Sequence, residues 1–343
     1  MKPSIVFRAD GNAAIGLGHV IRSLALVQLL QNDFHCHFLI RGASDALRQQ
    51  ISSHCQMTEL SDIPPDQEAI QVCNRFLNGR EIVVLDGYHF DTTYQRQIRQ
   101  KGSKLVCIDD MHQHHFVADA IINHSPGVRP EHYSHETWTR CCLGPSYSLL
   151  RPAFREASQS TRYIDRIDQL FICFGGADSQ QLSLRALEAI SGQALGLSAI
   201  HVVLGSANQS VEKVKAFASI TNENILVYQN LKANEMVELM QECHLAIVPS
   251  SSILYEVMAV QMPAITGYYV DNQCGLYAGF CQLGGIHGIG DFTRFDNYVE
   301  AIWHIREQGA LEYLKAEAHT SIAESGQQLS QLFHSLNPLV LCN

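Results

Sequence analysis

The chain has 343 residues, well over the roughly 150 of a typical domain, so two domains with ample core are expected. Its composition, 46% hydrophobic and 17% charged, is that of a globular protein and excludes a disordered chain. Lysine and arginine total 24 against 34 aspartate and glutamate residues. No basic run interrupts this net charge of -10, which disfavours a nucleic-acid or anionic-membrane partner.

The eleven cysteines indicate a reducing compartment. Their number is odd, and several lie in apolar runs such as 105–108 and 170–173, where a reduced cysteine packs as a small hydrophobe. No CxxC pair supports a structural zinc site. A strand-like run begins at Ser4, which leaves no room for a signal peptide, and no apolar stretch reaches the roughly 18 residues of a membrane span. We therefore expect a cytoplasmic protein without a membrane partner.

Short apolar runs alternate with amphipathic stretches along almost the whole chain, as in the helical pattern of residues 20–30. Because the strand-like runs are continuously apolar, they predict parallel sheets covered by helices, an α/β fold. The predicted strands are 3–8, 34–40, 81–85, 104–108, 119–122, 169–173, 199–204, 224–228, 244–248 and 263–268.

A polar segment at 155–162, followed by a fresh strand, predicts a domain boundary. We expect Rossmann-like, doubly wound domains at 1–155 and 163–343, facing a central cleft that holds the ligand at the carboxyl ends of the strands. Each domain opens with a strand, a glycine-containing turn and a helix. Residues from 295 to about 336 have a helical pattern, and we expect them to pack across the pair of domains.

The first glycine turn is Gly16-Leu17-Gly18-His19, at the start of a helix. Glycines there let the backbone approach a ligand, and the helix terminus offers free N–H groups. A dinucleotide site or a plain tight turn are the alternatives. Ile21 occupies the third glycine position of a dinucleotide fingerprint, and Arg41 follows the next strand where such a site carries an acid. A dehydrogenase is therefore disfavoured, and the absence of a Gly-Lys-Ser/Thr loop disfavours a kinase or NTPase.

His19 is the candidate general base, because the positive end of a helix disfavours imidazolium and keeps the ring able to accept a proton. A histidine that merely caps the helix is the alternative. Acidic residues follow two predicted strands, at Asp86 and at Asp109-Asp110. Helix capping or loop anchoring is their favoured interpretation, although one of them could orient His19 or bind a sugar hydroxyl. For the run 112–115, rich in histidine, a surface loop is favoured over a metal site.

In the second half, Ser250-Ser251-Ser252 precedes an apolar helical stretch at 253–259. These serines are expected to cap the helix, whose amino end offers a seat for a diphosphate. Glu256 is expected in the first turn, where its carboxylate could reach two ribose hydroxyls or simply complement the helix dipole. Asp271-Asn272-Gln273 follows the last predicted strand and could bind ligand or start a helix.

Taken in this order, the motifs resemble the UDP-2,4-diacetamido-2,4,6-trideoxy-β-L-altropyranose hydrolases of pseudaminic acid biosynthesis, a family with the two-domain GT-B architecture of sugar-nucleotide glycosyltransferases. The match covers about residues 3 to 285, and Gly87 stands where a polar residue would also fit. The matching segments are Phe7-Arg8-Ala9-Asp10, Ile15-Gly16-Leu17-Gly18-His19 with Arg22, Asp86-Gly87-Tyr88, Asp109-Asp110, Gly144-Pro145-Ser146-Tyr147 with Leu150-Arg151, Phe174-Gly175-Gly176-Ala177-Asp178, Ser251-Ser252 with Glu256, and Tyr269-Val270-Asp271-Asn272-Gln273.

The resemblance implies an enzyme that hydrolyses the bond between the anomeric carbon and UDP. It implies that His19 is the water-activating base, that Tyr88 and Asn272 lie in the sugar pocket, and that Glu256 binds the ribose. The implied substrate-binding set is Gly16, Gly18, Arg22, Tyr88, Asn272 and Gln273. The implied UDP-binding set is Gly175, Gly176, Ser251, Ser252 and Glu256.

Direct attack by water predicts inversion at the anomeric carbon. We expect neither a metal nor a cofactor, because helix ends and amides can stabilise the departing diphosphate. The alternative is a GT-B glycosyltransferase that uses a UDP-sugar donor and a hydroxyl acceptor in place of water.

Overall fold

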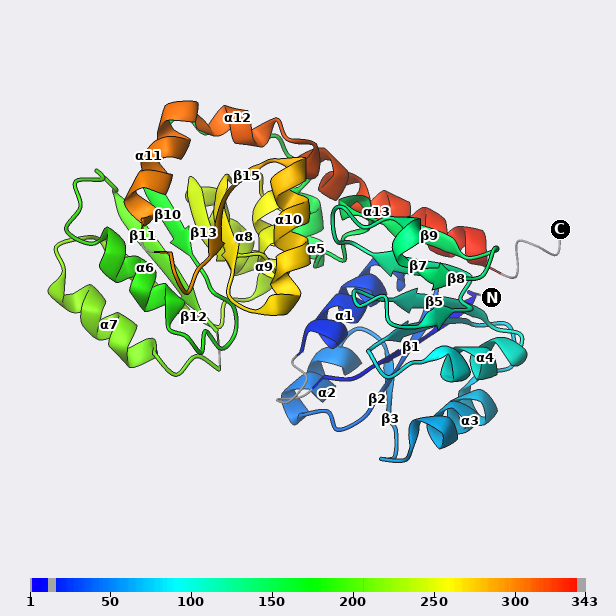
Figure 1. Cartoon of the computed structure of the whole chain (residues 1–343). Coiled ribbons are helices and arrows are strands. Elements are labelled where there is room, and N and C mark those ends of the chain that lie inside the picture. The colour runs from blue at the N-terminus through cyan, green and yellow to red at the C-terminus, as the bar shows by residue number, and fades with distance from the viewer. Residues whose placement is uncertain (1, 12–16, 206, 296, 338–343) are drawn as a thin grey trace. The chain divides into compact units, whose positions relative to one another are not determined.

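The computed structural model describes residues 2–11, 17–205, 207–295 and 297–337. Contacts divide the chain into two compact units, Met1–Pro152 with Glu324–Asn343, and Ala153–Ala323 (Figure 1). The division after Pro152 lies close to the expected boundary. Residues from Glu324 onward group with the first unit, although the sequence pattern predicts a second domain that extends from 163 to 343.

The first unit is built on a seven-stranded parallel sheet with the order β3-β2-β1-β4-β5-β7-β9. Its strands are β1 Ser4–Ala9, β2 His35–Ile40, β3 Gln56–Glu59, β4 Ile82–Asp86, β5 Lys104–Ile108, β7 Ala120–Asn123 and β9 Arg140–Leu143, with a small separate pair, β6 His115–Phe116 and β8 Ser134–His135. Its helices are α1 Gly18–Leu30, α2 Asp45–Ser52, α3 Pro65–Phe76, α4 Thr92–Gln100, the short η1 Pro130–His132 and η2 Pro145–Tyr147, and the later part of α13 Glu317–Leu336.

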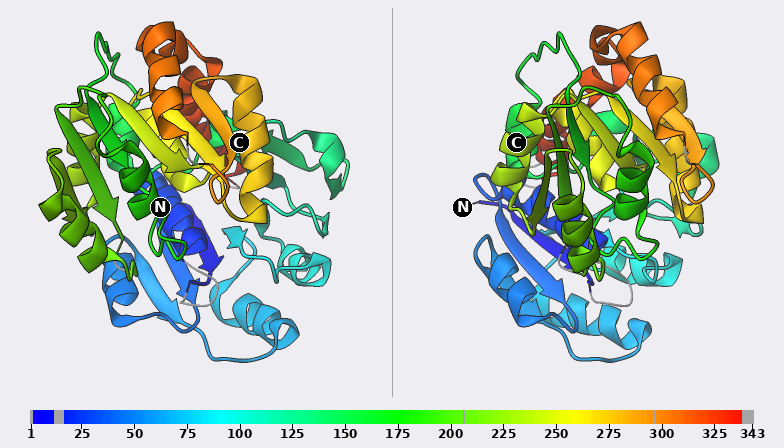
Figure 2. Two further views of the ribbon diagram at one scale, coloured as in Figure 1. Left: turned by 60° about the vertical axis from the view of Figure 1, so that its left-hand side comes forward. Right: turned by 90° about the vertical axis from the view of Figure 1, so that its left-hand side faces the viewer.

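Helices cover both faces of this sheet (Figure 2). Successive strand residues point to opposite faces, so each strand contributes to two cores. On one face, β1 and β4 pack with α1 and α13 through Phe7, Val84, Leu24 and Phe333. On the other face, strand residues such as Val83 pack with α3 and α4. By this alternation Asp86, two residues after Val84, points to the α1 face.

The second unit has a six-stranded parallel sheet with the order β12-β11-β10-β13-β14-β15. Its strands are β10 Gln169–Ile172, β11 Ala199–Leu204, β12 Ile225–Gln229, β13 Leu245–Pro249, β14 Ala264–Tyr268 and β15 Ile286–Asp291. Its helices are α5 Pro152–Ala157, α6 Leu182–Ile190, α7 Val211–Ile220, α8 Ala233–Glu242, α9 Ser252–Ala259, the short η3 Asp271–Gln273, α10 Cys274–Leu283, α11 Tyr298–Gln308, α12 Ala310–Leu314 and the start of α13.

Numbered within each unit, both sheets contain the strand order 3-2-1-4-5-6 of a doubly wound fold, and the first adds β9 as a seventh strand at its edge. The predicted α/β class with two Rossmann-like domains is confirmed. In such sheets ligands bind at the carboxyl ends of the strands beside the point where the order reverses. That point lies between β1 and β4 in the first unit and between β10 and β13 in the second. Across the described ranges, no helix has both the length and the apolar character that crossing a membrane requires.

Candidate functional site

The first group of candidate side chains lies at the carboxyl ends of β1, β4 and β5. Ala9 at the end of β1 is in register with Asp86 on β4, which is in turn in register with Ile108 on β5. Helix α1 begins at Gly18, soon after β1 ends, and its first turn carries His19. The position of His19 at a helix start agrees with the sequence prediction. Gly16 lies outside the described residues.

His19 is held by a buried carboxylate. Its Nδ1 lies 2.7 Å from Oδ1 of Asp86, and the residue is 7% exposed. Burial by itself would raise the pKa of Asp86, but Arg22 and His19 together hold it below its usual range. An ionised carboxylate only accepts hydrogen bonds, so Nδ1 carries the ring proton and donates a hydrogen bond to Asp86. The lone pair of the ring is then on Nε2, the atom that a general base would use.

Arg22 lies one turn further along α1 and joins two carboxylates. Its Nε donates to Oδ2 of Asp86 at 2.8 Å and its Nη2 to Oδ1 at 2.6 Å. Its Nη1 donates to Oδ2 of Asp110 at 2.8 Å, while Nη2 is also 3.0 Å from Nδ1 of His19. Residues three apart on a helix share a face, which explains why His19 and Arg22 meet the same acid. Ser23 completes the contacts of Asp86 with a hydroxyl donor at 3.1 Å.

Tyr88 forms the exposed side of this group. The edge-to-face contact of its ring with His19 has a centroid separation of 4.8 Å, yet Tyr88 is 49% exposed. Burial and the nearby Asp110 raise its pKa to about 12, so the phenol is neutral at physiological pH. Gly87 has a φ of 157°, and a Cβ at this position would lie 3.0 Å from the ring of Phe90. The structure therefore favours glycine at 87, although the sequence comparison would allow a polar residue.

The remaining acidic and histidine candidates of this region make local contacts of their own. Asp109 anchors its own turn by accepting the backbone N–H groups of Met111 and His112 at 3.1 and 2.9 Å, as the loop-anchor interpretation predicts. His114 contacts the backbone oxygen of Tyr88 at 3.1 Å, and His115 lies 3.3 Å from the carboxylate of Glu136. The described ranges hold no cluster of three or more histidine, cysteine or acidic side chains suited to a metal ion.

A buried charge network, for which the sequence analysis gave no role, lies on the opposite face of the same strands. Arg8 is fully buried and donates to Asp10 at 2.5 and 2.8 Å and to Glu68 at 2.8 and 3.0 Å. Tyr94 also donates to Glu68, and the backbone N–H of Arg41 donates to Asp10. These bonds fix the chain where it leaves β1. The sequence signal for this network was Arg8 itself, a charged residue within the otherwise apolar run 5–9.

The second group lies in the other unit, after β10 and β13. Gly175 has a φ of +84°, a conformation that favours glycine, and a Cβ at Gly175 or Gly176 would meet nothing within 4 Å. The backbone of Gly176 also passes close to Gly205: a Cβ on residue 205 would lie 2.4 Å from the Cα of Gly176. Asp178 accepts the backbone N–H groups of Leu182 and Ser183, so it fixes the start of α6. An open, glycine-lined turn therefore follows β10.

Helix α9 follows β13 and differs in detail from the prediction. Ser251 occupies the N-cap position, but its hydroxyl makes no capping bond within the described structure. Ser250 is buried and bonded to Thr266, and Ser252 is exposed at the first helical residue. Glu256 is the fifth residue of α9 and lies in its second turn, so the prediction that it lies in the first turn is wrong. Its side chain is partly buried.

The two remaining candidates lie in η3, after β14. Asn272 is exposed, whereas Gln273 is buried and its Oε1 accepts the backbone N–H of Tyr269 at 3.1 Å. Gln273 thus holds the loop that carries Asn272. Each unit brings its own candidates to the carboxyl ends of its central strands.

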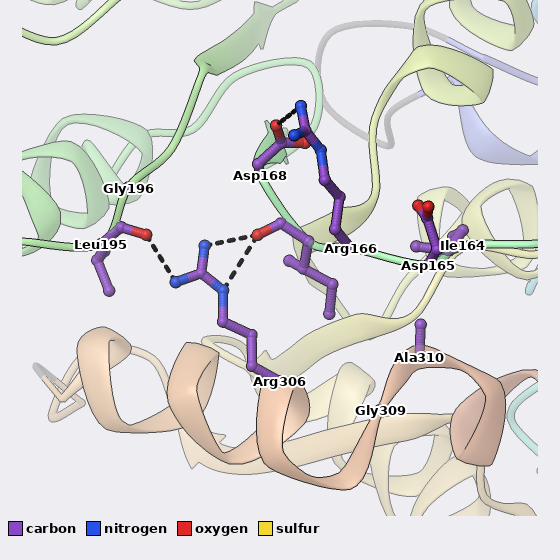
Figure 3. A pocket seen from close by; sticks show the side chains of 10 residues that line it. Ile164, Asp165, Arg166, Asp168, Leu195, Gly196, Arg306, Gly309 and Ala310 are labelled. Atoms are coloured by element: carbon purple, nitrogen blue, oxygen red, sulfur yellow. Dashed lines mark hydrogen bonds and ion pairs between the residues drawn. The ribbon is translucent and has the colours of Figure 1, made fainter.

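A surface pocket of the second unit lies at the other end of that sheet. It is lined by residues that precede β10 and β11, among them Asp168 and Gly196 (Figure 3). Arg306 points into this region and donates to the backbone oxygens of Ile167 at 3.1 Å and Leu195 at 2.6 Å. Its guanidinium is therefore occupied in joining α11 to the amino ends of the strands, and the predicted site residues lie elsewhere.

Solved structures with this arrangement define the fold class. The chain aligns with Acinetobacter baumannii MurG at a TM-score of 0.67 and 14% identity, over 97% of this chain and 100% of that one. It aligns with CalG4, the calicheamicin glycosyltransferase, at a TM-score of 0.63 and 10% identity, over 98% of both chains. The protein has the GT-B fold, as predicted.

Within that class, two curated relatives confirm the resemblance seen in the sequence. The UDP-2,4-diacetamido-2,4,6-trideoxy-β-L-altropyranose hydrolase of Campylobacter jejuni is 25% identical over 78% of this chain and 93% of its own length. The spore coat polysaccharide biosynthesis protein SpsG of Bacillus subtilis is 24% identical over 82% of each chain. No protein-family profile matches the chain. The chain is thus a distant relative of this hydrolase.

Proposed function

We propose that the protein hydrolyses UDP-2,4-diacetamido-2,4,6-trideoxy-β-L-altropyranose to UDP and the free sugar, in pseudaminic acid biosynthesis. The comparisons support an enzyme that acts on UDP-sugars, and the Campylobacter relative supports this particular reaction. The observation that carries the proposal is the contact of His19 with Asp86 beside the half-exposed ring of Tyr88.

In the proposed reaction, Nε2 of His19 takes a proton from a water molecule while the water oxygen forms a bond to the anomeric carbon. The bond from that carbon to the UDP oxygen breaks, and its electron pair leaves with UDP. Attack opposite to the leaving group inverts the anomeric carbon. Asp86 stabilises the imidazolium that forms, as the buried acid does in a Ser-His-Asp triad.

In this proposal, separate residues bind the diphosphate, the ribose and the sugar. The amino end of α9 with Ser251 and Ser252, together with the open turn at Gly175 and Gly176, suits a diphosphate. Glu256 is assigned to the ribose. Tyr88, Asn272 and the backbone at Gly18 are assigned to the sugar. Arg22 and Gln273 already serve carboxylates and a backbone N–H, so we assign them to holding the site in shape.

Release of UDP in the absence of any acceptor tests the proposal. The wild-type protein should release UDP from this substrate, and His19→Asn should lower kcat by about two orders of magnitude or more while UDP affinity stays unchanged. In water enriched in oxygen-18, the label should enter the sugar. Label on the phosphate would show attack at phosphorus. UDP release that requires an added alcohol would instead identify a glycosyltransferase.

A further inference from the structure

The guanidinium of Arg22 lies between two carboxylates, but His19 contacts one of them. Arg22 donates to both oxygens of Asp86 and, through Nη1, to Asp110 at 2.8 Å. Asp86 also receives the imidazole N–H of His19. Asp110 lies on the far side of the guanidinium, and within the described residues Arg22 is what links it to the imidazole ring. Asp110 therefore has no direct part in the proton transfer described above.

The role of Asp110 follows from the charged groups that surround His19. The titratable groups that the described elements bring to this region are Arg22 from α1, Asp86 from β4, Cys107 from β5, Tyr88 and Asp110 from the loops after β4 and β5, and His124 after β7. Burial raises the pKa of the Cys107 thiol well above its usual range, so this group is neutral. Burial and Arg22 lower the pKa of His124 to about 4, and that of Tyr88 is raised to about 12, so both are neutral near pH 7. Arg22 and the two carboxylates carry the charge.

When His19 takes a proton, two positive and two negative charges balance in this partly buried group. Without the charge of Asp110, imidazolium and guanidinium would share the single carboxylate of Asp86. Two positive charges at this separation disfavour each other, and the effect is larger where the groups are partly shielded from water. We propose that Asp110 is a positioning residue that offsets the charge of Arg22 and so leaves the Asp86 carboxylate available to stabilise protonated His19. This inference rests on the proposed role of His19 as the base.

Asp109 provides a matched control within the same loop. It carries the same charge one residue away, but its Oδ2 is bonded to backbone N–H groups of its own turn. Replacing Asp109 removes one negative charge from the loop without removing a partner of Arg22. A general effect of loop charge would appear in both variants, whereas the proposed effect is specific to Asp110.

The test is the titration of the His19 ring by nuclear magnetic resonance in the protein without substrate, with its signal assigned by its loss in His19→Asn. In Asp110→Asn the midpoint of this titration should fall by about one pH unit relative to wild type. Asp110→Glu, which keeps the charge, should restore most of it, and Asp109→Asn should leave it unchanged. The acidic limb of the pH profile for UDP release should move to lower pH in Asp110→Asn, with the plateau rate about 3-fold to 10-fold lower.

An unchanged His19 titration in folded Asp110→Asn would overturn the inference, as would an equal shift in Asp109→Asn. If Asp110→Asn does not fold, a wild-type midpoint in Asp110→Glu together with a lowered one in Asp110→Ser would support it, and equal midpoints in those two variants would overturn it. The titration needs no substrate. A shifted titration in a protein that releases no UDP would therefore reject the proposed function and leave the charge relationship standing.

Discussion

Nδ1 of His19 lies 2.7 Å from Oδ1 of Asp86, although 67 residues separate them in the chain. The contact exists because β4 pairs with β1, which sets Asp86 in register with Ala9 at the carboxyl edge of the sheet. The chain leaves β1 at this edge and begins α1 at Gly18, so the first turn of the helix meets the end of β4. The doubly wound strand order thus brings together a base and the acid that orients it.

This relationship predicts a large effect of Asp86→Asn. A side-chain amide can donate a hydrogen bond to Nδ1, which would stabilise the tautomer with its proton on Nε2 and remove the lone pair that accepts from water. We expect kcat for UDP release to fall by roughly 10²-fold to 10⁴-fold with little change in KM. Steady-state kinetics on the folded variant measures both.

Ser23→Ala is the control for that substitution. It removes the hydroxyl hydrogen bond to Oδ2 of Asp86 but keeps the carboxylate, its bonds to Arg22 and its contact with His19. Because the contact that sets the tautomer of His19 is kept, kcat of Ser23→Ala should fall much less than that of Asp86→Asn, by about tenfold or less. If kcat of Asp86→Asn stays within tenfold of wild type, Asp86 does not determine the tautomer of the base.

Glu256→Ala should separate binding from chemistry. The ribose contact assigned to Glu256 is present in substrate and product alike, so its loss should raise KM more than it lowers kcat. Calorimetry should show UDP itself binding about 10-fold to 100-fold more weakly, the range for a hydrogen bond to a charged group. Glu188→Ala, which removes an exposed acid from α6 of the same unit, should leave UDP affinity unchanged. Equal affinity in wild type and Glu256→Ala would remove Glu256 from the nucleotide site.

Much of this architecture was predictable, because buried parallel strands are apolar throughout. The strands that were missed are short or polar. Three of them lie at the edges of the two large sheets: β3 has the sequence Gln-Met-Thr-Glu, β9 has the sequence Arg-Cys-Cys-Leu, and β15 contains Gly288 and Gly290. The two-residue strands β6 and β8 form a separate pair. Such strands bury little and carry no clear pattern. The helical pattern of α13 was also visible. The sequence did not predict that Leu329 and Phe333 of this helix pack in the core of the first unit, because periodicity shows that a helix has an apolar face but not what that face packs against.

The candidate site was predictable in its residue types and less so in its contacts. His19 at a helix start and Asp86 at a strand end follow from local pattern. Their pairing requires β4 to lie next to β1, and strand order is not encoded in any short segment. The same holds for Arg8 and Glu68, which are 60 residues apart and form buried ion pairs. A charged residue in an apolar strand signals that a partner exists without identifying it.

Hydrolysis should survive removal of divalent cations. In the proposed site, the diphosphate is stabilised by the amino end of α9 and by backbone amides. The acids of the first unit already have partners: Asp86 and Asp110 bind Arg22, and Asp109 binds backbone N–H groups. We therefore expect UDP release to continue at a nearly unchanged rate in excess EDTA. Complete loss of activity that a divalent ion restores, and buffer exchange does not, would assign Asp109 and Asp110 as metal ligands.

The stability of the fold should fall as the pH decreases from about 6.5 to 4. Burial and the nearby Arg8 lower the pKa of His89 to about 4, and burial and Arg22 do the same for His124. Over this range the unfolded chain binds protons on both imidazoles, whereas the folded chain does not. Stability rises with pH wherever the unfolded state binds more protons, so acidification is destabilising here, by up to about 1.4 kcal/mol per pH unit for each histidine.

Urea denaturation of His89→Gln between pH 4.5 and 7 isolates one of these histidines. The slope of the unfolding free energy against pH is proportional to the number of protons taken up on unfolding. In His89→Gln this number should be smaller by close to one, because glutamine binds no proton in either state. The buried acids Asp10 and Glu68 also have lowered pKa values, and their contribution to stability begins to be lost below about pH 5, as the pH falls toward the ordinary values of 3.8 and 4.5 at which the unfolded chain binds these protons. His35→Gln is the control, since His35 is exposed and no buried imidazole is removed. A His89→Gln slope equal to that of wild type would show that His89 gains its proton equally in the folded and unfolded states.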